Sequence, residues 1–226
     1  MKVQIYNTYE EMSSAAADLV AAQLRLKPTS HLGLTAGSTP IGMFAALTEL
    51  YTNHHVSFAD CWFYNLEEMV LPISDPGTCR NYFHRHFIDQ TDAKPERLIL
   101  PNGQAENTME ECAHYDKILE DLPDGQLDMQ ILGIGSDAHI GMNRPNEKLD
   151  PLCHPARSGK GVDAIAMGVS QILKAKRIIL LANGEAKAQA VADMCHEKIT
   201  TAIPATLLQL HPNVTIFLDK EAASRL

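Results

Sequence analysis

An aspartate and a histidine two residues apart follow a short apolar segment near the middle of the chain. Residues 129–134 predict a buried parallel strand, and Asp137 and His139 come directly after it. A carboxylate beside an imidazole can fix the tautomer of the ring and stabilise its protonated form, as general acid–base catalysis requires. Both residue types are also common in loops, so the pair by itself is compatible with a plain surface loop.

Small and hydroxyl-bearing residues separate another predicted strand from a helix near the N-terminus. Residues 31–35 predict the strand, and Gly37, Ser38 and Thr39 precede Pro40, which suits a first helical turn. Small residues allow a ligand close to the backbone, and the free amides at a helix start bind anions. This order of elements favours a phosphate-binding turn over a plain turn, although neither a P-loop nor a dinucleotide-binding motif is present.

Two further charged positions could complete a site. Glu67 and Glu68 follow a strand predicted at residues 61–66, where a carboxylate could act as a general base or simply face solvent. Lys187 lies in the first turn of a helix, where a cation is unfavourable unless a bound anion neutralises it. Open α/β sheets bind ligands at the carboxyl ends of their strands, so we expect these groups to converge.

Strands and helices alternate along the chain. Strands are predicted at residues 3–6, 31–35, 61–66, 98–100, 129–134, 162–167, 177–182 and 214–218. Helices are predicted at residues 8–26, after residue 40, at 81–87, 107–122 and 169–173, from residue 184, and as a helical turn at 204–210. Thr8 and Glu11 have the spacing of a capping box, and the polar, basic residues 153–161 predict a loop or lid. The alternation indicates one α/β domain over residues 1–226, with a single doubly wound, mostly parallel, Rossmann-like sheet flanked by helices.

The composition argues against several classes of protein. The net charge of −9 and the absence of a basic run predict no nucleic-acid partner. The N-terminus lacks the apolar core of a signal peptide and no apolar run is long enough to cross a bilayer, so we expect a cytoplasmic protein with no membrane partner. Five scattered cysteines without C-x-x-C predict no disulfide framework and no structural zinc site. Although the chain has ten histidines, no converging carboxylate accompanies His54, His55, His84, His86 or His114 in the sequence, so we expect no metal site.

In combination, these motifs resemble the sugar-phosphate deaminase/isomerase family over nearly the whole chain. Residues 33–40 are similar to the phosphate turn of the family, and residues 64–68 to its N-x-D-E segment. Residues 133–145 are similar to its G-x-G-x-x-G-H-x-x-x-N-E-P segment, with Ala138 in place of the third glycine. Three segments specifically resemble the galactosamine-6-phosphate branch, namely residues 75–79, 151–154 and 201–205.

The resemblance implies conversion of galactosamine 6-phosphate, or glucosamine 6-phosphate, to a ketose 6-phosphate and ammonia without metal, nucleotide or other cofactor. Ser38, Thr39 and Lys187 would hold the phosphate, with support from the Gly37 amide. His139 would assist ring opening, Asp137 would orient His139, and the carboxylate at position 67 would take the proton from C2. The expected partner is therefore a small sugar phosphate, and a homo-oligomer is left open.

Two positions depart from the family pattern. Glu67 stands where the family has Asp, and a displacement of a reacting group by about 1 Å can cost on the order of a hundredfold in rate. Arg144 stands where the family has a Glu that partners the histidine, and the segment after His154 is shorter, which leaves Arg157 as the candidate for the family's phosphate-binding arginine. Two alternatives stay open: a hydrolase similar to 6-phosphogluconolactonase, and a sugar-phosphate-binding protein without catalysis.

Overall fold

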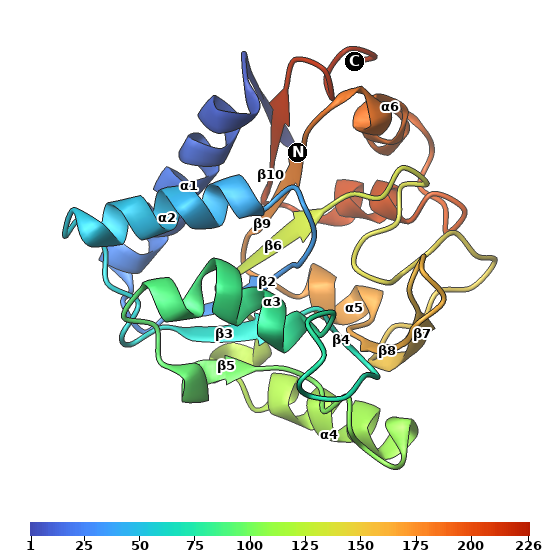
Figure 1. Ribbon diagram of the computed structural model, residues 1–226. Coiled ribbons are helices and arrows are strands. Elements are labelled where there is room, and N and C mark those ends of the chain that lie inside the picture. Colours follow the sequence, from blue (N-terminus) through green and yellow to red (C-terminus); the bar gives the residue numbers. More distant parts are fainter.

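A seven-stranded parallel sheet runs through the centre of the computed structural model, which describes residues 1–226 (Figure 1). The spatial order of the strands is β1 (Lys2–Tyr6), β10 (Val214–Asp219), β9 (Ile178–Ala182), β6 (Met129–Gly133), β2 (His31–Leu34), β3 (Trp62–Asn65) and β5 (Leu98–Ile99). Every neighbouring pair is parallel, so each connection has to cross a face of the sheet. The predicted mostly parallel sheet is confirmed.

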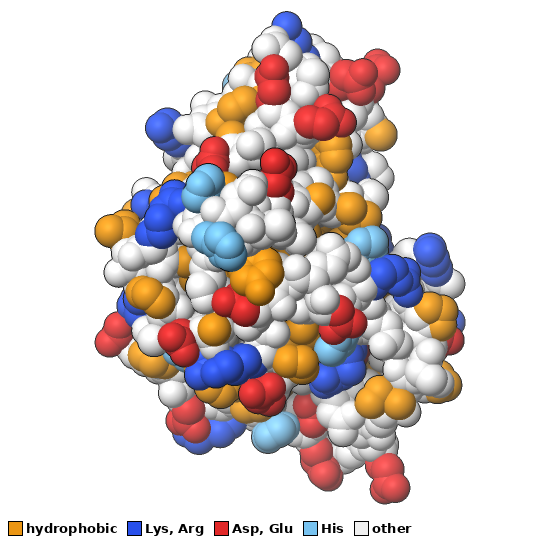
Figure 2. Space-filling view, turned by 60° about the vertical axis from the view of Figure 1, so that its left-hand side comes forward, with side chains coloured by type: hydrophobic (Ala, Val, Ile, Leu, Met, Phe, Trp, Pro, Cys, Tyr) orange, Lys and Arg blue, Asp and Glu red, His pale blue; other side chains and the backbone are white.

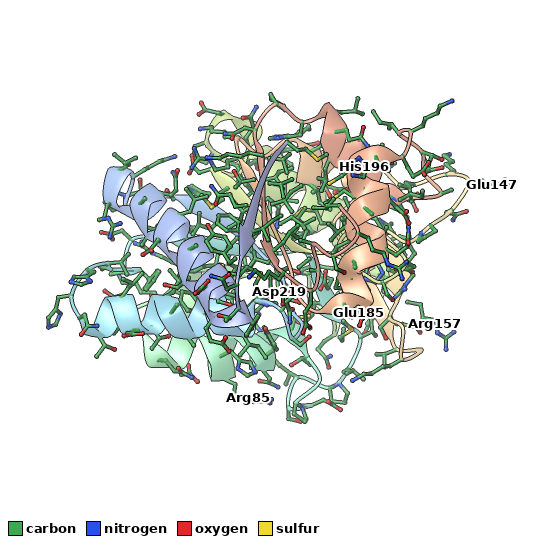
Figure 3. All side chains as sticks on the ribbon, turned by 90° about the horizontal axis from the view of Figure 1, so that it is seen from above. Arg85, Glu147, Arg157, Glu185, His196 and Asp219 are labelled. Carbon is green, nitrogen blue, oxygen red and sulfur yellow. The ribbon has the colours of Figure 1, made fainter.

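Helices cover both faces of this sheet. One face carries α1 (Tyr9–Leu26), α2 (Ile41–Thr52) and α3 (Cys79–His86), and the other carries α4 (Thr108–Glu120), α5 (Val169–Leu173) and α6 (Ala188–His196). Seen from above in Figure 3, the blue helices α1 and α2 lie on one side of the strands and the orange helix α6 on the other. Alternate residues of β9 explain this arrangement, because Ile178 and Leu180 pack into one apolar layer while Ile179 and Leu181 pack into the other. The sheet is therefore doubly wound, as predicted.

Short 3₁₀ segments complete the connections between these elements. They are η1 (Ile88–Gln90), η2 (Pro95–Arg97), η3 (Pro123–Gly125), η4 (Glu185–Lys187) and η5 (Pro204–Leu210). The predicted start of the first helix is confirmed, since the Thr8 hydroxyl accepts the N–H of Glu11 at 3.1 Å and the Glu11 carboxylate accepts the N–H of Asn7 at 2.9 Å. The first bond satisfies an amide that the helix leaves free, and the second holds the residue before the cap.

A second sheet, which the sequence did not indicate, lies beside the main one. It has the antiparallel order β4 (Glu67–Met69), β8 (Asp163–Ala166) and β7 (His154–Arg157). The prediction of a loop over residues 153–161 is wrong for residues 154–157, which pair with β8. β7 is a short edge strand that contains a proline and has only half-exposed and exposed residues, so its sequence lacks the apolar signal of a buried strand.

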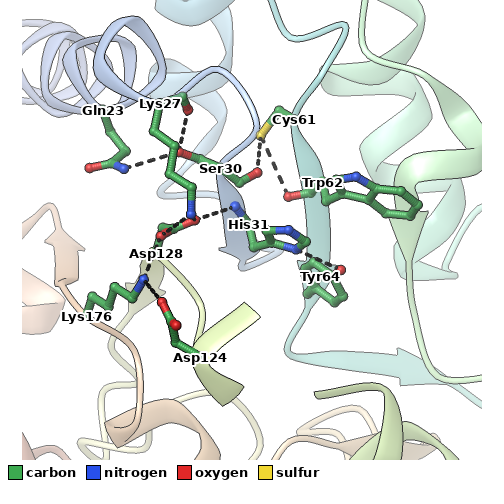
Figure 4. Close-up of polar contacts among 10 residues, drawn as sticks. All are labelled: Gln23, Lys27, Ser30, His31, Cys61, Trp62, Tyr64, Asp124, Asp128 and Lys176. Atoms are coloured by element: carbon green, nitrogen blue, oxygen red, sulfur yellow. Dashed lines mark hydrogen bonds and ion pairs between the residues drawn. The ribbon is translucent and has the colours of Figure 1, made fainter. Parts of the chain in front are cut away.

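Charged side chains cluster at the amino end of the main sheet, away from the strand ends predicted to bind a ligand (Figure 4). The Asp128 carboxylate, just before β6, is nearly buried and lies 2.7 Å from Lys27 Nζ and 3.3 Å from Lys176 Nζ. It also accepts the N–H of His31, the first residue of β2, at 2.9 Å. These contacts connect the N-terminal ends of the neighbouring strands β2 and β6.

The outer surface carries mixed charges. On the face shown in Figure 2, acidic and basic side chains are interspersed with separate hydrophobic ones. None of the helices combines the length and the hydropathy needed to cross a bilayer.

Candidate active site

A cleft opens where the strand order of the main sheet reverses. From β2 the chain moves outward to β3 and β5, whereas from β6 it moves in the other direction to β9 and β10. The loops that leave β2 and β6 therefore diverge, which is how open α/β sheets form ligand sites. The resulting cleft has a volume of about 300 Å³. It is lined by residues 35–40, 133–136, 141 and 142, and by Glu67, His139, Arg144 and Lys187.

Seven of the eight predicted site residues line this cleft. The eighth, Asp137, does not line it but contacts His139. Arg157 is not part of the cleft, because its exposed side chain lies 3.8 Å from the Asp163 carboxylate and at the periphery of the molecule in Figure 3. A larger hollow of about 390 Å³ near Tyr51 and His54 contains none of the predicted residues.

The turn between β2 and α2 presents its backbone to the cleft. Gly37 has φ +112°, in the region that favours glycine, so the turn needs a glycine at this point. Thr39 donates its hydroxyl to Asn183 Oδ1 at 2.8 Å, which ties the turn to the end of β9. The amides of Ser38 and Thr39 donate to no other protein atom. The turn can therefore offer two free N–H donors to an anion.

Lys187 supplies the positive charge on the other side of the turn. It lies at the N-terminal end of α6, forms no ion pair, and lines the cleft. Burial lowers the pKa of its ammonium group, while the charge of Asp137 acts in the opposite direction. A cation that is desolvated and unpaired beside two free amides is suited to a phosphate group.

Asp137, His139 and Arg144 form one charged cluster at the edge of the cleft. Asp137 Oδ1 lies 2.5 Å from His139 Nδ1, and Asp137 Oδ2 lies 3.2 Å from Arg144 Nη1. Because Nδ1 must donate its proton to the carboxylate, the 3.5 Å contact between Arg144 Nη1 and His139 Nδ1 is not a second hydrogen bond. The tautomer follows from this geometry and leaves Nε2 of His139 without a protein partner.

The charges around His139 favour the neutral ring. Burial lowers the pKa of the imidazole, the Asp137 carboxylate raises it, and the positive charges of Arg144 and Lys187 lower it again, with a net decrease. Close packing fixes the ring as well, since a Cβ at Gly135 would lie 2.1 Å from Nδ1 of His139. Ala138 has φ +60°, so it holds a backbone conformation better suited to glycine. The ring can accept a proton through Nε2.

The two adjacent glutamates have different environments. Glu68 accepts the N–H groups of Met69 at 2.7 Å, Cys79 at 2.6 Å and Arg80 at 3.0 Å, so it caps the start of α3. Glu67 is buried, lines the cleft, and its Oε2 has no hydrogen-bond partner. Burial, and then the charge of Glu68, raise the pKa of Glu67 to about 7. Of the pair, only Glu67 lines the cleft.

The structure adds two residues that the sequence reasoning missed. Asn183 follows β9 and holds Thr39, and its position at a strand end was an available signal. Gly141, with φ +56°, lies against Glu67, because a Cβ at this position would be 3.7 Å from Glu67 Oε2. No feature of the sequence alone indicated that contact.

The fold and the cleft together define a doubly wound α/β protein with free backbone amides and titratable side chains at the point where the strand order reverses. Residues 7–217 match the family described as glucosamine-6-phosphate isomerases/6-phosphogluconolactonase, and the chain belongs to this family. The resemblance predicted from the motifs is confirmed.

Curated relatives and solved structures agree with this membership. The glucosamine-6-phosphate deaminase of Thermoanaerobacter pseudethanolicus is 41% identical over 99% of this chain and 94% of its own length. The glucosamine-6-phosphate deaminase of Halothermothrix orenii is 41% identical over the full length of both chains. The structure of a monomeric glucosamine-6-phosphate deaminase is similar with a TM-score of 0.95 and 35% identity over all of both chains. A 6-phosphogluconolactonase from Trypanosoma brucei has a TM-score of 0.85 at 21% identity, which is a likeness of fold.

Proposed function

We propose that this chain is a hexosamine-6-phosphate deaminase, which converts an amino-sugar 6-phosphate and water to a ketose 6-phosphate and ammonia. One observation carries the proposal: a buried carboxylate with an unpartnered oxygen, an imidazole with a free nitrogen and an anion-binding turn all meet in one cleft. The volume of about 300 Å³ suits a single sugar phosphate rather than a dinucleotide. The deaminase relatives and the 0.95 TM-score support the same activity.

The phosphate group would bind at the end of the cleft formed by the turn. Ser38 and Thr39 supply N–H donors and the Ser38 hydroxyl is available beside them, while Lys187 supplies the charge. Gly37 allows the backbone to approach the anion closely. Binding the phosphate would place the sugar ring between this turn and the acid–base groups.

The reaction needs a proton acceptor at two stages, and the cleft contains two. His139 Nε2 can accept the proton of the anomeric hydroxyl and pass it to the ring oxygen, which opens the ring, while Asp137 holds Nδ1. Glu67 then takes the proton from C2 and returns it to C1, while one N–H proton of the amino group passes to O1. C1 is thereby reduced to a hydroxymethyl group and C2 becomes an imine carbon. Water adds at C2 and ammonia leaves. A base with a pKa near 7 is suited to this role at neutral pH.

The substrate can be either of two epimers, glucosamine 6-phosphate or galactosamine 6-phosphate. The three segments that resemble the galactosamine-6-phosphate branch, at residues 75–79, 151–154 and 201–205, do not line the cleft. The relatives described above are glucosamine-6-phosphate deaminases. We therefore propose glucosamine 6-phosphate as the first substrate and galactosamine 6-phosphate as the second. A cytoplasmic location and one domain over residues 1–226 stay predictions, as does the choice between monomer and homo-oligomer.

One experiment separates the candidate functions. The purified chain is incubated with glucosamine 6-phosphate, galactosamine 6-phosphate and 6-phosphogluconolactone, and ammonia release and acid production are followed. We expect ammonia from a hexosamine 6-phosphate. Acid from the lactone without ammonia would favour the hydrolase, and tight binding of a sugar phosphate without either product would favour the binding protein suggested by Glu67 and Arg144.

A further inference from the structure

Two tyrosines from different helices hold the carbonyl groups of the phosphate turn. The Tyr82 hydroxyl, on α3, donates to the carbonyl oxygen of Gly37 at 2.6 Å. The Tyr9 hydroxyl, on α1, lies 2.8 Å from the carbonyl oxygen of Thr39 and 3.3 Å from that of Ser38. Tyr9 also accepts the N–H of Gly42, in the first turn of α2, at 2.7 Å.

These contacts determine which way the peptide groups of the turn face. In a planar trans peptide the C=O and the following N–H point in opposite directions. When Tyr82 holds the Gly37 carbonyl, the Ser38 N–H must point away from Tyr82. The Ser38 carbonyl is approached by the Tyr9 hydroxyl at 3.3 Å and by the N–H of Ile41 at 3.4 Å, so the Thr39 N–H points away from them. The shorter bond of Tyr9, to the Thr39 carbonyl, holds the peptide group before Pro40. The tyrosine hydroxyls hydrogen-bond to carbonyl groups of the turn, and the N–H groups of Ser38 and Thr39 are left free to bind an anion.

Tyr82 is well suited to this contact. Burial and the nearby phenol of Tyr9 raise the pKa of Tyr82, so its hydroxyl keeps the proton that it donates. The ring is fixed by edge-on packing against Phe44 and Phe83, with centroids 6.4 and 5.2 Å apart. A rigid ring and a protonated hydroxyl hold the Gly37 carbonyl in one orientation.

Helix α3 also reaches the opposite side of the cleft. Its first amides are bound by Glu68, the neighbour of Glu67, and Tyr82 follows within the next turn. The same short helix therefore contacts the phosphate turn and the strand that carries the proposed base. A change in the contact between Tyr82 and Gly37 would alter the turn without removing any group that touches the substrate.

We propose that Tyr9 and Tyr82 are positioning residues that orient the backbone amides of residues 38 and 39 toward a phosphate group. The proposal rests on the proposed phosphate site and goes beyond it, because neither tyrosine lines the cleft. Loss of either hydroxyl allows the turn to rotate a carbonyl toward the anion. Affinity for the phosphate group should fall, and the acid–base steps should be affected much less.

The experiment compares Tyr9→Phe, Tyr82→Phe and the double variant with the parent chain. Tyr51→Phe is the matched control, because Tyr51 is a half-buried tyrosine on α2 whose hydroxyl makes no hydrogen bond. Inorganic phosphate is titrated by calorimetry, and kcat and KM are measured with glucosamine 6-phosphate. Thermal unfolding of each variant identifies any loss of folded protein, and binding of unphosphorylated glucosamine reports on the sugar end of the cleft.

We expect each single variant to weaken phosphate binding and raise KM by about 3- to 10-fold, the range of one lost hydrogen bond, with kcat changed less than 2-fold. Glucosamine binding and the Tyr51→Phe variant should match the parent. Equal phosphate affinity in parent and variants would overturn the proposal while leaving the phosphate site intact. Equal losses for phosphorylated and unphosphorylated ligands would also overturn it, since that result indicates general loosening. A parent chain that does not distinguish glucosamine from its 6-phosphate would overturn this proposal and the proposed function together.

Discussion

At the residue scale, Glu67 is distinguished from Glu68 by its surroundings rather than by its type. Both side chains are buried, but Glu68 accepts three N–H groups, whereas Glu67 lines the cleft and its Oε2 has no hydrogen-bond partner. Burial raises the pKa of Glu67 to about 7, so near neutral pH the carboxylate form is accessible and is a stronger base than an exposed carboxylate. The longer stem of Glu, compared with the Asp of the family pattern, is accommodated beside Gly141.

Glu67→Gln should abolish proton transfer at C2 while substrate binding survives, because the amide keeps the size of the side chain and cannot accept the proton. The measurement is exchange of the C2 hydrogen of glucosamine 6-phosphate with deuterated solvent, which we expect to fall by at least about 100-fold, as for loss of a general base. Glu106→Gln, at an exposed position, is the control and should exchange at the parent rate. Undiminished exchange in Glu67→Gln would assign the base to another group.

Glu67 should also make the stability of the parent depend on pH. Its pKa is about 7 in the folded chain and about 4.3 in the unfolded chain, so between these values the folded state binds more protons. Stability should therefore decrease as pH rises from about 4 to 7, by on the order of 3 kcal/mol from this residue, and then level off. Urea unfolding at several pH values tests this, and Glu67→Gln should lack that part of the decrease. Parallel pH profiles for parent and variant would contradict the buried environment of Glu67.

Arg144 shares the Asp137 carboxylate with His139 and so disfavours the imidazolium form. Arg144→Glu replaces a positive charge with a negative one and should raise the pKa of His139 and increase turnover more than it changes binding. Arg144→Gln is the matched control, since it removes the positive charge without adding a negative one, and it should give a smaller change of the same sign. Weaker substrate binding without faster turnover would instead indicate that Arg144 holds the phosphate group.

At the element scale, α3 begins on a carboxylate from a neighbouring strand rather than on local residues alone. Thr78 caps one amide through its side chain, and Glu68 binds two more from β4. The helix is only eight residues long, so tertiary contacts of this kind have to stabilise it. The position of α3 therefore depends on the same strand that carries Glu67.

Glu68→Ala should destabilise the chain by about 2 kcal/mol, because buried amides at the start of α3 lose their acceptor. It should also lower kcat/KM, since α3 contacts both sides of the cleft. Asn107→Ala removes the cap of α4, which accepts two amides outside the cleft. This control should cost about 1 kcal/mol in stability and leave kcat/KM unchanged. Denaturant unfolding and steady-state kinetics distinguish the two, and equal kinetic effects would argue against a link between α3 and the site.

At the scale of the whole molecule, the functional cleft and a stabilising charge cluster lie at opposite ends of the main sheet. The carboxyl ends of the strands bear the cleft, whereas the amino ends of β2 and β6 are joined by Asp128, Lys27 and Lys176. Burial raises the pKa of Asp128, but the bonds from Lys27 and the His31 N–H outweigh it, so the net shift is downward. The carboxylate contributes stability above its unfolded pKa, and that contribution is lost as pH falls through the lower folded value.

Asp128→Asn should therefore lower stability at neutral pH by about 2 kcal/mol, because a nearly buried charge pair loses one member. The loss should become smaller as pH falls below about 4, because the unfolded chain takes up the proton first and the folded carboxylate does so only at its lower pKa. Kinetic constants should stay at the parent values, since the cluster lies at the opposite end of the strands from the cleft. Unfolding and kinetics of the same preparations provide the test, and a large fall in kcat would show that the two ends of the sheet are coupled.

The sequence by itself determined the alternation of strands and helices, and with it the doubly wound sheet. Apolar runs such as residues 177–182 and capping residues such as Thr8 act over a few neighbours, so their signals are readable along the chain. We also expected eight residues to form one site, because the carboxyl ends of parallel strands share an edge. Seven of them line the cleft, and Asp137 contacts His139 instead. Their catalytic roles stay predictions.

Only the tertiary structure decided what depends on contacts between distant segments. The pairing of β7 with β8 and β4 joins weak, half-exposed strands whose sequences carry little apolar signal. The difference between Glu67 and Glu68 arises because two N–H groups of α3 reach only the Glu68 carboxylate. Burial raises the pKa of both residues, but these hydrogen bonds oppose the increase at Glu68, whereas Oε2 of Glu67 has no hydrogen-bond partner. Tyr9 and Tyr82 are about thirty and forty-five residues away from the turn that they hold, and Arg144 meets Asp137 only after the loop has folded back. Burial and desolvation are properties of the packed chain, so no reading of residue types and spacing could assign them.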